Sequence, residues 1–453
     1  MYTHQAGLTA AKNLELERAL RDADGRTVGR DLALREQIHP LTQERGLTLP
    51  LTAPALDLAN LTVLQHKVSG CIQFAFPVQG AQPVPQLTPQ APGYAFGFIR
   101  PRQLGIGAAA AGLLDWTVKA ALHLAQGGVT QAVVREIERR SKPEGFINLS
   151  RGYRQPATAA ELAQARGQKV LLFIHGIFSS TAGAFDDLGA ADDGAATLRP
   201  LLERYRNLVF GYDHWTISKT PQQNAVDLLN AIPADAGWDI DIVCHSRGGL
   251  VVRSLLAVVA DGAAPATAEL QQIAALRRGR IAQIGRAFFI AAANQGSPLA
   301  DPDQIRDFLN AAALLASRSD CFGLDLVIGL AQYVVSSGFG LPAIEALDGS
   351  SQLIADLNAR GTLLDAAATY YARADFDYAQ SALLETGVFL DKYLIKVDND
   401  LVVPYDGVSL PEFDVDAAHR LNFGTPAAKQ GRVWHTEFFC QPETRQFLRD
   451  GLV

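Results

Sequence analysis

Residues 239–254 read Asp-Ile-Asp-Ile-Val-Cys-His-Ser-Arg-Gly-Gly-Leu-Val-Val-Arg-Ser, and the second half of the chain is organised around them. Residues 240–244 are largely apolar and β-branched, which is typical of a buried parallel strand, while residues 250–260 continue without Pro or Gly, as a buried helix would. Ser246 occupies the tight turn between them. A serine at such a corner has its hydroxyl pushed out above the sheet, and its neighbours must be small because the two backbones nearly touch.

The pattern expected for a nucleophilic serine at this corner is Gly-x-Ser-x-Gly, and the chain has Cys244, Ser246 and Gly248 at the fixed positions. The cysteine departs from the pattern, but it is small, so we keep the interpretation. An ordinary strand, turn and helix would give the same five residues. The rest of the chain therefore has to distinguish the two.

The length of 453 residues predicts two domains, or one large domain with an insertion. Residues 1–165 are interpreted as an accessory domain of unknown role, made of Pro-rich β segments and helices. Within it, residues 61–68 and 71–76 favour strands, and the Ala-rich residues 104–125 favour a packed helix.

Charge and cysteine content exclude several classes of protein. The net charge is −7 and the basic residues are dispersed, so no footprint for nucleic acid is present. The cysteines are too widely spaced for a zinc site or a disulfide framework, and they lie at Cys71, Cys244, Cys321 and Cys440. The first residues lack the features of a signal peptide, so we expect a cytoplasmic location.

One apolar stretch approaches the length of a membrane span. Residues 326–344 carry no charge, but Gln332, Gly338 and Pro342 interrupt them. We therefore expect two short apolar helices and no transmembrane segment. Transient contact with a lipid surface stays compatible with this stretch.

Residues 166–453 alternate between strand and helix patterns, with strands expected at 169–174, 207–212, 240–244 and 286–293. Such alternation predicts an α/β fold with a mostly parallel sheet covered by helices on both faces. Residues 301–387 interrupt it with Ala- and Leu-rich helical sequence, which predicts a cap insertion or, alternatively, a packed helical subdomain. Strand patterns then return at 393–397 and 431–439.

The polar residues at the ends of these strands are suited to nucleophilic catalysis. A serine hydroxyl is a poor nucleophile near neutral pH, so it needs a base within hydrogen-bond reach and an acid that orients the base. Ser246, Asp400 and His435 follow predicted strands in the order Ser, Asp, His, which is the order of one known arrangement of such groups.

The acid has three rivals. Asp398 lies two residues before Asp400, and Asp301 or Asp303 follows the strand at 286–293. Asp400 is preferred because Leu-Val-Val-Pro follows it directly.

His419 is the rival for the base, but it lies in a polar stretch that reads as loop, whereas His435 stands where the last predicted strand ends. His245 is excluded as the base, because adjacent side chains on a strand point to opposite faces. His175 is interpreted as a structural residue that orients its loop.

Four segments together resemble the α/β-hydrolase superfamily, and especially its lipase-like serine esterases, over about residues 168–453. They are His175-Gly176, the Cys-His-Ser-Arg-Gly-Gly turn, Asn-Gln-Gly-Ser-Pro-Leu-Ala at 294–300 and Asp-Leu-Val-Val-Pro at 400–404. The resemblance implies the α/β-hydrolase fold with a helical cap. No part of it extends to residues 1–165.

The resemblance also implies roles for the site residues. Ser246 would attack an acyl carbon, His435 would carry its proton, and Asp400 would orient the imidazole. Backbone N–H groups of Ile177 and Arg247 would bind the oxyanion, and the chemistry would need no metal and no cofactor.

The substrate is expected to be a carboxylic ester, with acyl lipids or acylglycerols preferred. Two alternatives stay open: a partner-binding or effector module with incidental catalysis, and amide or peptide hydrolysis on the same three residues. The oligomeric state cannot be read from the sequence.

Overall fold

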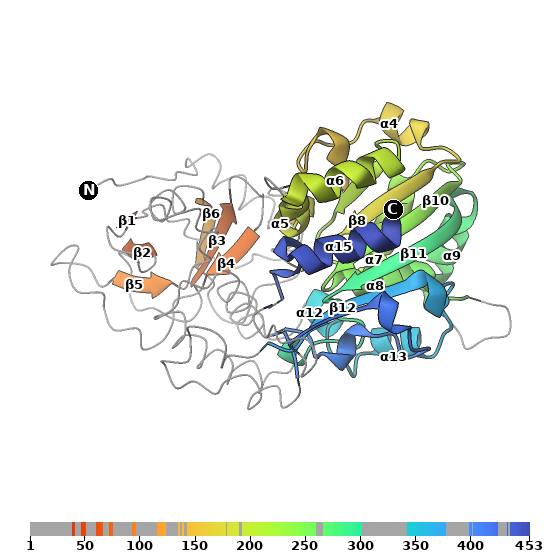
Figure 1. Cartoon of the computed structure of the whole chain (residues 1–453). Coiled ribbons are helices and arrows are strands. Elements are labelled where there is room, and N and C mark those ends of the chain that lie inside the picture. The colour runs from red at the N-terminus through yellow and green to blue at the C-terminus, as the bar shows by residue number, and fades with distance from the viewer. Residues whose placement is uncertain are drawn as a thin grey trace. The chain divides into compact units, whose positions relative to one another are not determined.

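The computed structural model describes residues 143–177, 179–189, 193–259, 266–300, 342–376, 398–400, 402–424, 433 and 435–453, together with six short strands and three helical residues before residue 143. Contacts divide the chain into two compact units (Figure 1). One comprises residues 1–141, 301–341 and 385–390, and the other comprises residues 142–300, 342–384 and 391–453.

In the first unit, the described residues form two small antiparallel sheets. One has the order β1 (His39–Pro40), β2 (Leu47–Pro50), β5 (Gly93–Phe96), and the other β4 (Ile72–Ala75), β3 (Asn60–His66), β6 (Trp116–His123). The strands expected at 61–68 and 71–76 are confirmed as β3 and β4. The helix expected over 104–125 is wrong where the structure describes it, because Trp-Thr-Val-Lys opens a β-type run that pairs with β3.

The second unit is built on a seven-stranded sheet in the order β13-β12-β11-β10-β8-β9-β7. β7 runs antiparallel to β9, and all other neighbours are parallel. The strands are β7 (Gly145–Asn148), β8 (Lys169–Ile174), β9 (Val209–Asp213), β10 (Trp238–His245), β11 (Ile281–Ile290), β12 (Thr369–Ala374) and β13 (Arg420–Phe423). This mostly parallel sheet with its crossover helices has the α/β-hydrolase fold, as the sequence predicted.

Helices cover both faces of this sheet. The α-helices are α4 (Ala159–Gln164), α5 (Thr181–Phe185), α6 (Asp193–Arg204), α7 (Pro221–Ala231), α8 (Gly248–Leu256), α9 (Ala268–Arg280), α12 (Pro342–Glu345), α13 (Gln352–Asn358) and α15 (Pro442–Leu452). The 3₁₀ helices are η1 (Leu149–Arg151), η2 (Asp186–Gly189), η3 (Pro298–Ala300), η4 (Ala366–Ala368), η7 (Asp406–Val408), η8 (Ala417–His419) and η9 (Phe438–Cys440). Figure 1 shows α6 beside α15, and these two pack together, while α7, α8 and α9 contact one another.

The main core lies between the sheet and the layer formed by α6 and α15. Successive side chains of a strand alternate between the faces, so Phe173, Val243 and Phe288 point to this core. Leu201 and Leu448 meet them from the two helices. Both faces of the central strands are therefore buried, which is why their sequences read as nearly continuous apolar runs.

Two expectations about the last strands are corrected. Residues 369–374, inside the expected helical stretch 301–387, form β12, and the last strand is β13 rather than part of residues 431–439. β12 contains Arg373 and β13 is a short edge strand with intermediate exposure, so neither is a continuous apolar run. Residues 438–440 are apolar because η9 packs Phe438 and Phe439 into the core.

Most of the expected cap, residues 301–387, lies outside the described residues. Residues 301–341, 377–387 and 393–397 lie outside the described residues, and between them the structure describes α12, α13 and η4. None of the helices within the described ranges combines the length and the apolar character that a bilayer span requires.

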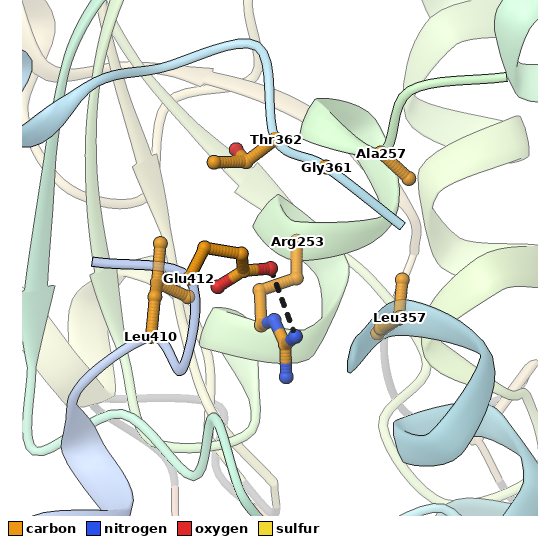
Figure 2. A pocket seen from close by; sticks show the side chains of 7 residues that line it. All are labelled: Arg253, Ala257, Leu357, Gly361, Thr362, Leu410 and Glu412. Atoms are coloured by element: carbon orange, nitrogen blue, oxygen red, sulfur yellow. Dashed lines mark ion pairs between the residues drawn. The ribbon is translucent and has the colours of Figure 1, made fainter. Parts of the chain in front are cut away.

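Arg253 fixes the far end of α8. Its side chain is 3% exposed; it donates to the carbonyl of Asn294 and to Asn358 Oδ1 at 2.8 Å, and it pairs with Glu412 at 3.5 Å. Figure 2 shows the Glu412 carboxylate facing this guanidinium in a small pocket, with Leu357 and Leu410 among the lining residues. One side chain thus links α8 to three other segments.

We predict that Arg253→Met lowers the free energy of unfolding by about 3 kcal/mol, because it leaves the Glu412 carboxylate without its buried cation. Urea unfolding followed by circular dichroism measures the change. The matched control is Arg166→Met, which removes an ion pair with Asp235 whose side chains are 56% and 68% exposed. That loss should stay below about 1 kcal/mol, and equal losses in the two variants would contradict the assigned role.

Candidate active site

Ser246 lies at a strained turn at the carboxyl end of the central strand β10. Its φ is +56°, in the left-handed region that residues other than glycine rarely adopt, at a cost of about 1–3 kcal/mol. Three backbone hydrogen bonds hold the turn: Ser246 N–H donates to Ile290 at 3.2 Å, and Ser246 C=O accepts from Gly249 at 2.9 Å and Ala293 at 3.0 Å. The observed corner is the one that the sequence predicts.

The glycines after this turn are required by close approach. A Cβ added to Gly248 would lie 2.5 Å from the carbonyl oxygen of Ile174, at the end of β8. One added to Gly249 would lie 2.7 Å from Ala292 Cβ. Strand and helix can therefore meet at this angle only if both positions lack a side chain.

Cys244, the departure from the expected pattern, fits without crowding the turn. Its thiol is fully buried and donates to the carbonyl of Phe288 at 3.4 Å. Burial raises the pKa of the thiol, so the group stays neutral. The thiol thus acts as a small core group two residues before Ser246.

The structure brings Ser246, His435 and Asp400 together. His435 Nε2 lies 2.8 Å from Ser246 Oγ, and His435 Nδ1 lies 2.9 Å from Asp400 Oδ2. The exposed fractions are 4%, 6% and 1% in the same order. An ionised carboxylate only accepts hydrogen bonds, so it selects the tautomer with hydrogen on Nδ1 and leaves Nε2 free to accept the serine proton.

The residues after Asp400 explain why it is the partner of His435. Asp400 Oδ1 accepts the backbone N–H groups of Val402 at 3.0 Å and Val403 at 2.7 Å. The Ser297 hydroxyl, from the segment after β11, donates to the Val402 carbonyl. Two of the segments that carry the resemblance therefore meet here, and together they fix the carboxylate.

The rival residues lie elsewhere. Asp398 is exposed, and its carbonyl accepts from Tyr405 N–H at 2.8 Å. His419 stacks on Tyr370 at 4.0 Å, with Nδ1 3.1 Å from the Ala366 carbonyl. Asp301 and Asp303 lie outside the described residues.

The loop after β8 packs directly against the serine. A Cβ added to Gly176 would lie 2.5 Å from Ser246 Cβ and 3.0 Å from its Oγ, so only glycine allows this approach. Buried His175 holds the loop, because its Nδ1 bonds the Gly176 carbonyl at 2.8 Å and its Nε2 accepts from His214 N–H at 3.3 Å. This arrangement places Ile177, the next residue, at the edge of the site.

Arg247 follows the serine at the start of α8. Its guanidinium is fully buried and donates to Asn224 Oδ1 at 3.0 Å and to the carbonyl of Lys219. The side chain thus packs toward α7, and any contribution of Arg247 to catalysis has to come from its backbone.

Sequence reasoning missed one contact of the site. His245 is not the base, but its ring centroid lies 4.8 Å from that of His435. The only feature of the sequence that pointed to this contact was the position of His245 next to Ser246. Within the described ranges, no three His, Cys, Asp or Glu side chains gather as ligands for a metal ion.

A family model described as "Domain of unknown function (DUF7379)" matches residues 136–453. A search of the curated proteins finds no match to the sequence.

Solved structures similar to the chain include the Bacillus licheniformis lipase BlEst2, with 16% identity, a TM-score of 0.33, and 63% of this chain and 93% of that one covered. Lipase 1 from Pelosinus fermentans has 13% identity, a TM-score of 0.36, and 63% and 98% coverage. Phospholipase PlaB from Legionella pneumophila has 13% identity, a TM-score of 0.35, and 54% and 46% coverage, so the match spans less than half of that protein.

We predict that Gly248→Ala lowers the free energy of unfolding by about 1–3 kcal/mol, because the methyl group would overlap the end of β8. Thermal and urea unfolding measure the loss. Gly361→Ala is the control, since its added methyl would meet only Val258 Cγ2 at 3.9 Å, and it should change stability by no more than about 0.5 kcal/mol. A Gly248→Ala variant as stable as the control would show that the turn can relax.

Proposed function

The chain belongs to the DUF7379 domain family, and we propose that it is a serine hydrolase that cleaves carboxylic esters through an acyl-enzyme. One observation carries the proposal: Ser246 Oγ, the His435 imidazole and the Asp400 carboxylate form a continuous chain of contacts of 2.8 and 2.9 Å. A base within this distance of a serine, oriented in turn by a carboxylate, is the arrangement that nucleophilic catalysis requires.

In the acylation step, Ser246 Oγ attacks the ester carbonyl carbon while its proton moves to His435 Nε2. Asp400 stabilises the resulting imidazolium through Nδ1–H. When the C–O bond to the alcohol breaks, Nε2–H protonates the departing oxygen. In deacylation, His435 takes a proton from water, the hydroxide attacks the acyl carbon, and the serine oxygen recovers the proton as the acid leaves.

The oxyanion of each tetrahedral intermediate would be bound by the backbone N–H groups of Ile177 and Arg247. The close packing of Gly176 on Ser246 supports the first, and the position of Arg247 directly after the serine supports the second. One such donor is worth about 3 kcal/mol in the transition state. The positive end of the α8 dipole adds to the same effect.

Acyl lipids or acylglycerols stay the predicted substrates, on the strength of the apolar residues 326–344, of which 326–341 lie outside the described residues. Amide hydrolysis would use the same three side chains. A partner-binding or effector module with incidental catalysis would keep the same contacts as well. The rate of ester hydrolysis distinguishes such a module from the proposed enzyme.

We expect the protein to react with a fluorophosphonate probe at Ser246, because the activated oxygen attacks phosphorus and expels fluoride. Mass mapping of the adduct after proteolysis identifies the residue. Labelling should be lost in Ser246→Ala and should fall by at least about 10³-fold in His435→Ala. A folded wild-type protein that takes up no label would refute the proposal.

The choice of acid gives a separate prediction. Asp400→Asn should lower kcat for p-nitrophenyl acetate by about 10³–10⁴-fold, because the amide no longer selects the tautomer that accepts the serine proton. Asp398→Asn, two residues away and exposed, is the matched control and should stay within about threefold of wild type. Steady-state kinetics on both variants make the comparison, and the reverse ranking would move the role to Asp398.

A further inference from the structure

We propose that His245 is a positioning residue that holds the main chain of His435, so that the imidazole stays aligned between Ser246 and Asp400. The inference rests on the proposed function, and it assigns a task to a side chain that the three-residue chemistry leaves unused. His245 is the last residue of β10 and directly precedes the serine.

The contact itself is a hydrogen bond to the backbone. His245 Nε2 lies 2.8 Å from the carbonyl oxygen of His435. A carbonyl oxygen can only accept, so Nε2 carries the hydrogen and donates it. This bond joins the residue before the nucleophile to the residue that supplies the base.

Both backbone polar groups of His435 are thereby tied to the site. Its N–H donates to the Asp400 carbonyl at 3.1 Å, and its C=O accepts from His245. The backbone that carries the His435 imidazole is therefore anchored on one side to Asp400 and on the other to His245, the last residue of β10. Rotation of that unit would move Nε2 away from Ser246 Oγ, and two anchors oppose the rotation.

The surroundings of His245 suit a neutral donor. The side chain is 8% exposed, and its ring lies 5.7 Å from the Phe439 ring at 71°, an edge-to-face contact. Burial, and then the neighbouring His435, lower the pKa of His245 to about 3. Above that pH the ring is neutral, so it places no second positive charge beside the imidazolium that forms during the reaction.

If the His245 ring only filled space, its substitutions would affect kcat differently than if it donated a hydrogen bond. Phenylalanine keeps the packing and loses the N–H. Glutamine carries an N–H donor at a similar distance from Cα, and methionine has a similar length without the donor. The Gln and Met variants therefore form a matched pair, and they decide the question even if the Phe variant does not fold.

The experiment measures kcat and KM for p-nitrophenyl acetate and the rate of fluorophosphonate labelling, for wild type, His245→Phe, His245→Met and His245→Gln. Concentrations are normalised by the final labelled fraction, and thermal midpoints are recorded. We expect His245→Phe and His245→Met to lower kcat about 10–100-fold with KM within about threefold, because small misplacement of a base affects the transition state most. His245→Gln should recover kcat to within about fivefold of wild type.

His419→Phe is the control, because His419 also contacts a backbone carbonyl and an aromatic ring, at a place remote from the serine. It should leave kcat unchanged. If wild type is active and His245→Phe or His245→Met retains its kcat, the positioning role is overturned while the proposed hydrolase function stands. The same holds if His245→Gln is as impaired as His245→Met. A wild type that neither labels nor hydrolyses the ester overturns both proposals.

Discussion

The site depends on the turn at Ser246, where the chain leaves the central strand with a φ of +56° and enters α8 two residues later. This strained conformation lifts the hydroxyl above the sheet, and it persists because its surroundings leave no alternative. Backbone hydrogen bonds to Ile290 and Ala293 hold the turn from the end of β11 and the segment after it. The contact between Gly248 and the end of β8 holds it from the neighbouring strand on the other side.

Asp400 and His435, the acid and the base of the proposed function, reach the edge of the sheet at Ser246 from irregular segments. Their positions are therefore fixed by hydrogen bonds between segments rather than by regular structure. Asp400 is fixed by the N–H groups of Val402 and Val403, and His435 is fixed through the Asp400 carbonyl and His245. Every one of these bonds uses a main-chain group. Such bonds position a side chain with little loss of rotamer entropy, which suits a loop better than side-chain contacts would.

The sequence predicts the central strands and the three polar residues, but not every element. β8 and the ends of β10 and β11 nearest the site are readable because burial makes them largely apolar, and Ser246 is readable from the turn that follows β10. Asp400 and His435 are predicted from their order in the chain, although the strand expected at 431–439 is wrong and the one at 393–397 lies outside the described residues. β12 and β13 are not readable, since strands near a sheet edge carry polar residues such as Arg373. The contact of His245 depends on the path of a loop 190 residues away, which no local pattern encodes.

Two arginines follow the serine, Arg247 at the N-cap of α8 and Arg253 within it, and their contacts bear on the proposed substrate. Either could serve in principle to meet an anionic group, yet Arg247 donates to Asn224 and Lys219 and Arg253 pairs with Glu412. A guanidinium already hydrogen-bonded in the interior would have to break these bonds before binding an anion, at a cost of several kcal/mol. These two positive charges therefore hold α8 against its neighbours. Under the proposed function the reacting carbonyl is neutral, so neither guanidinium is needed to bind it.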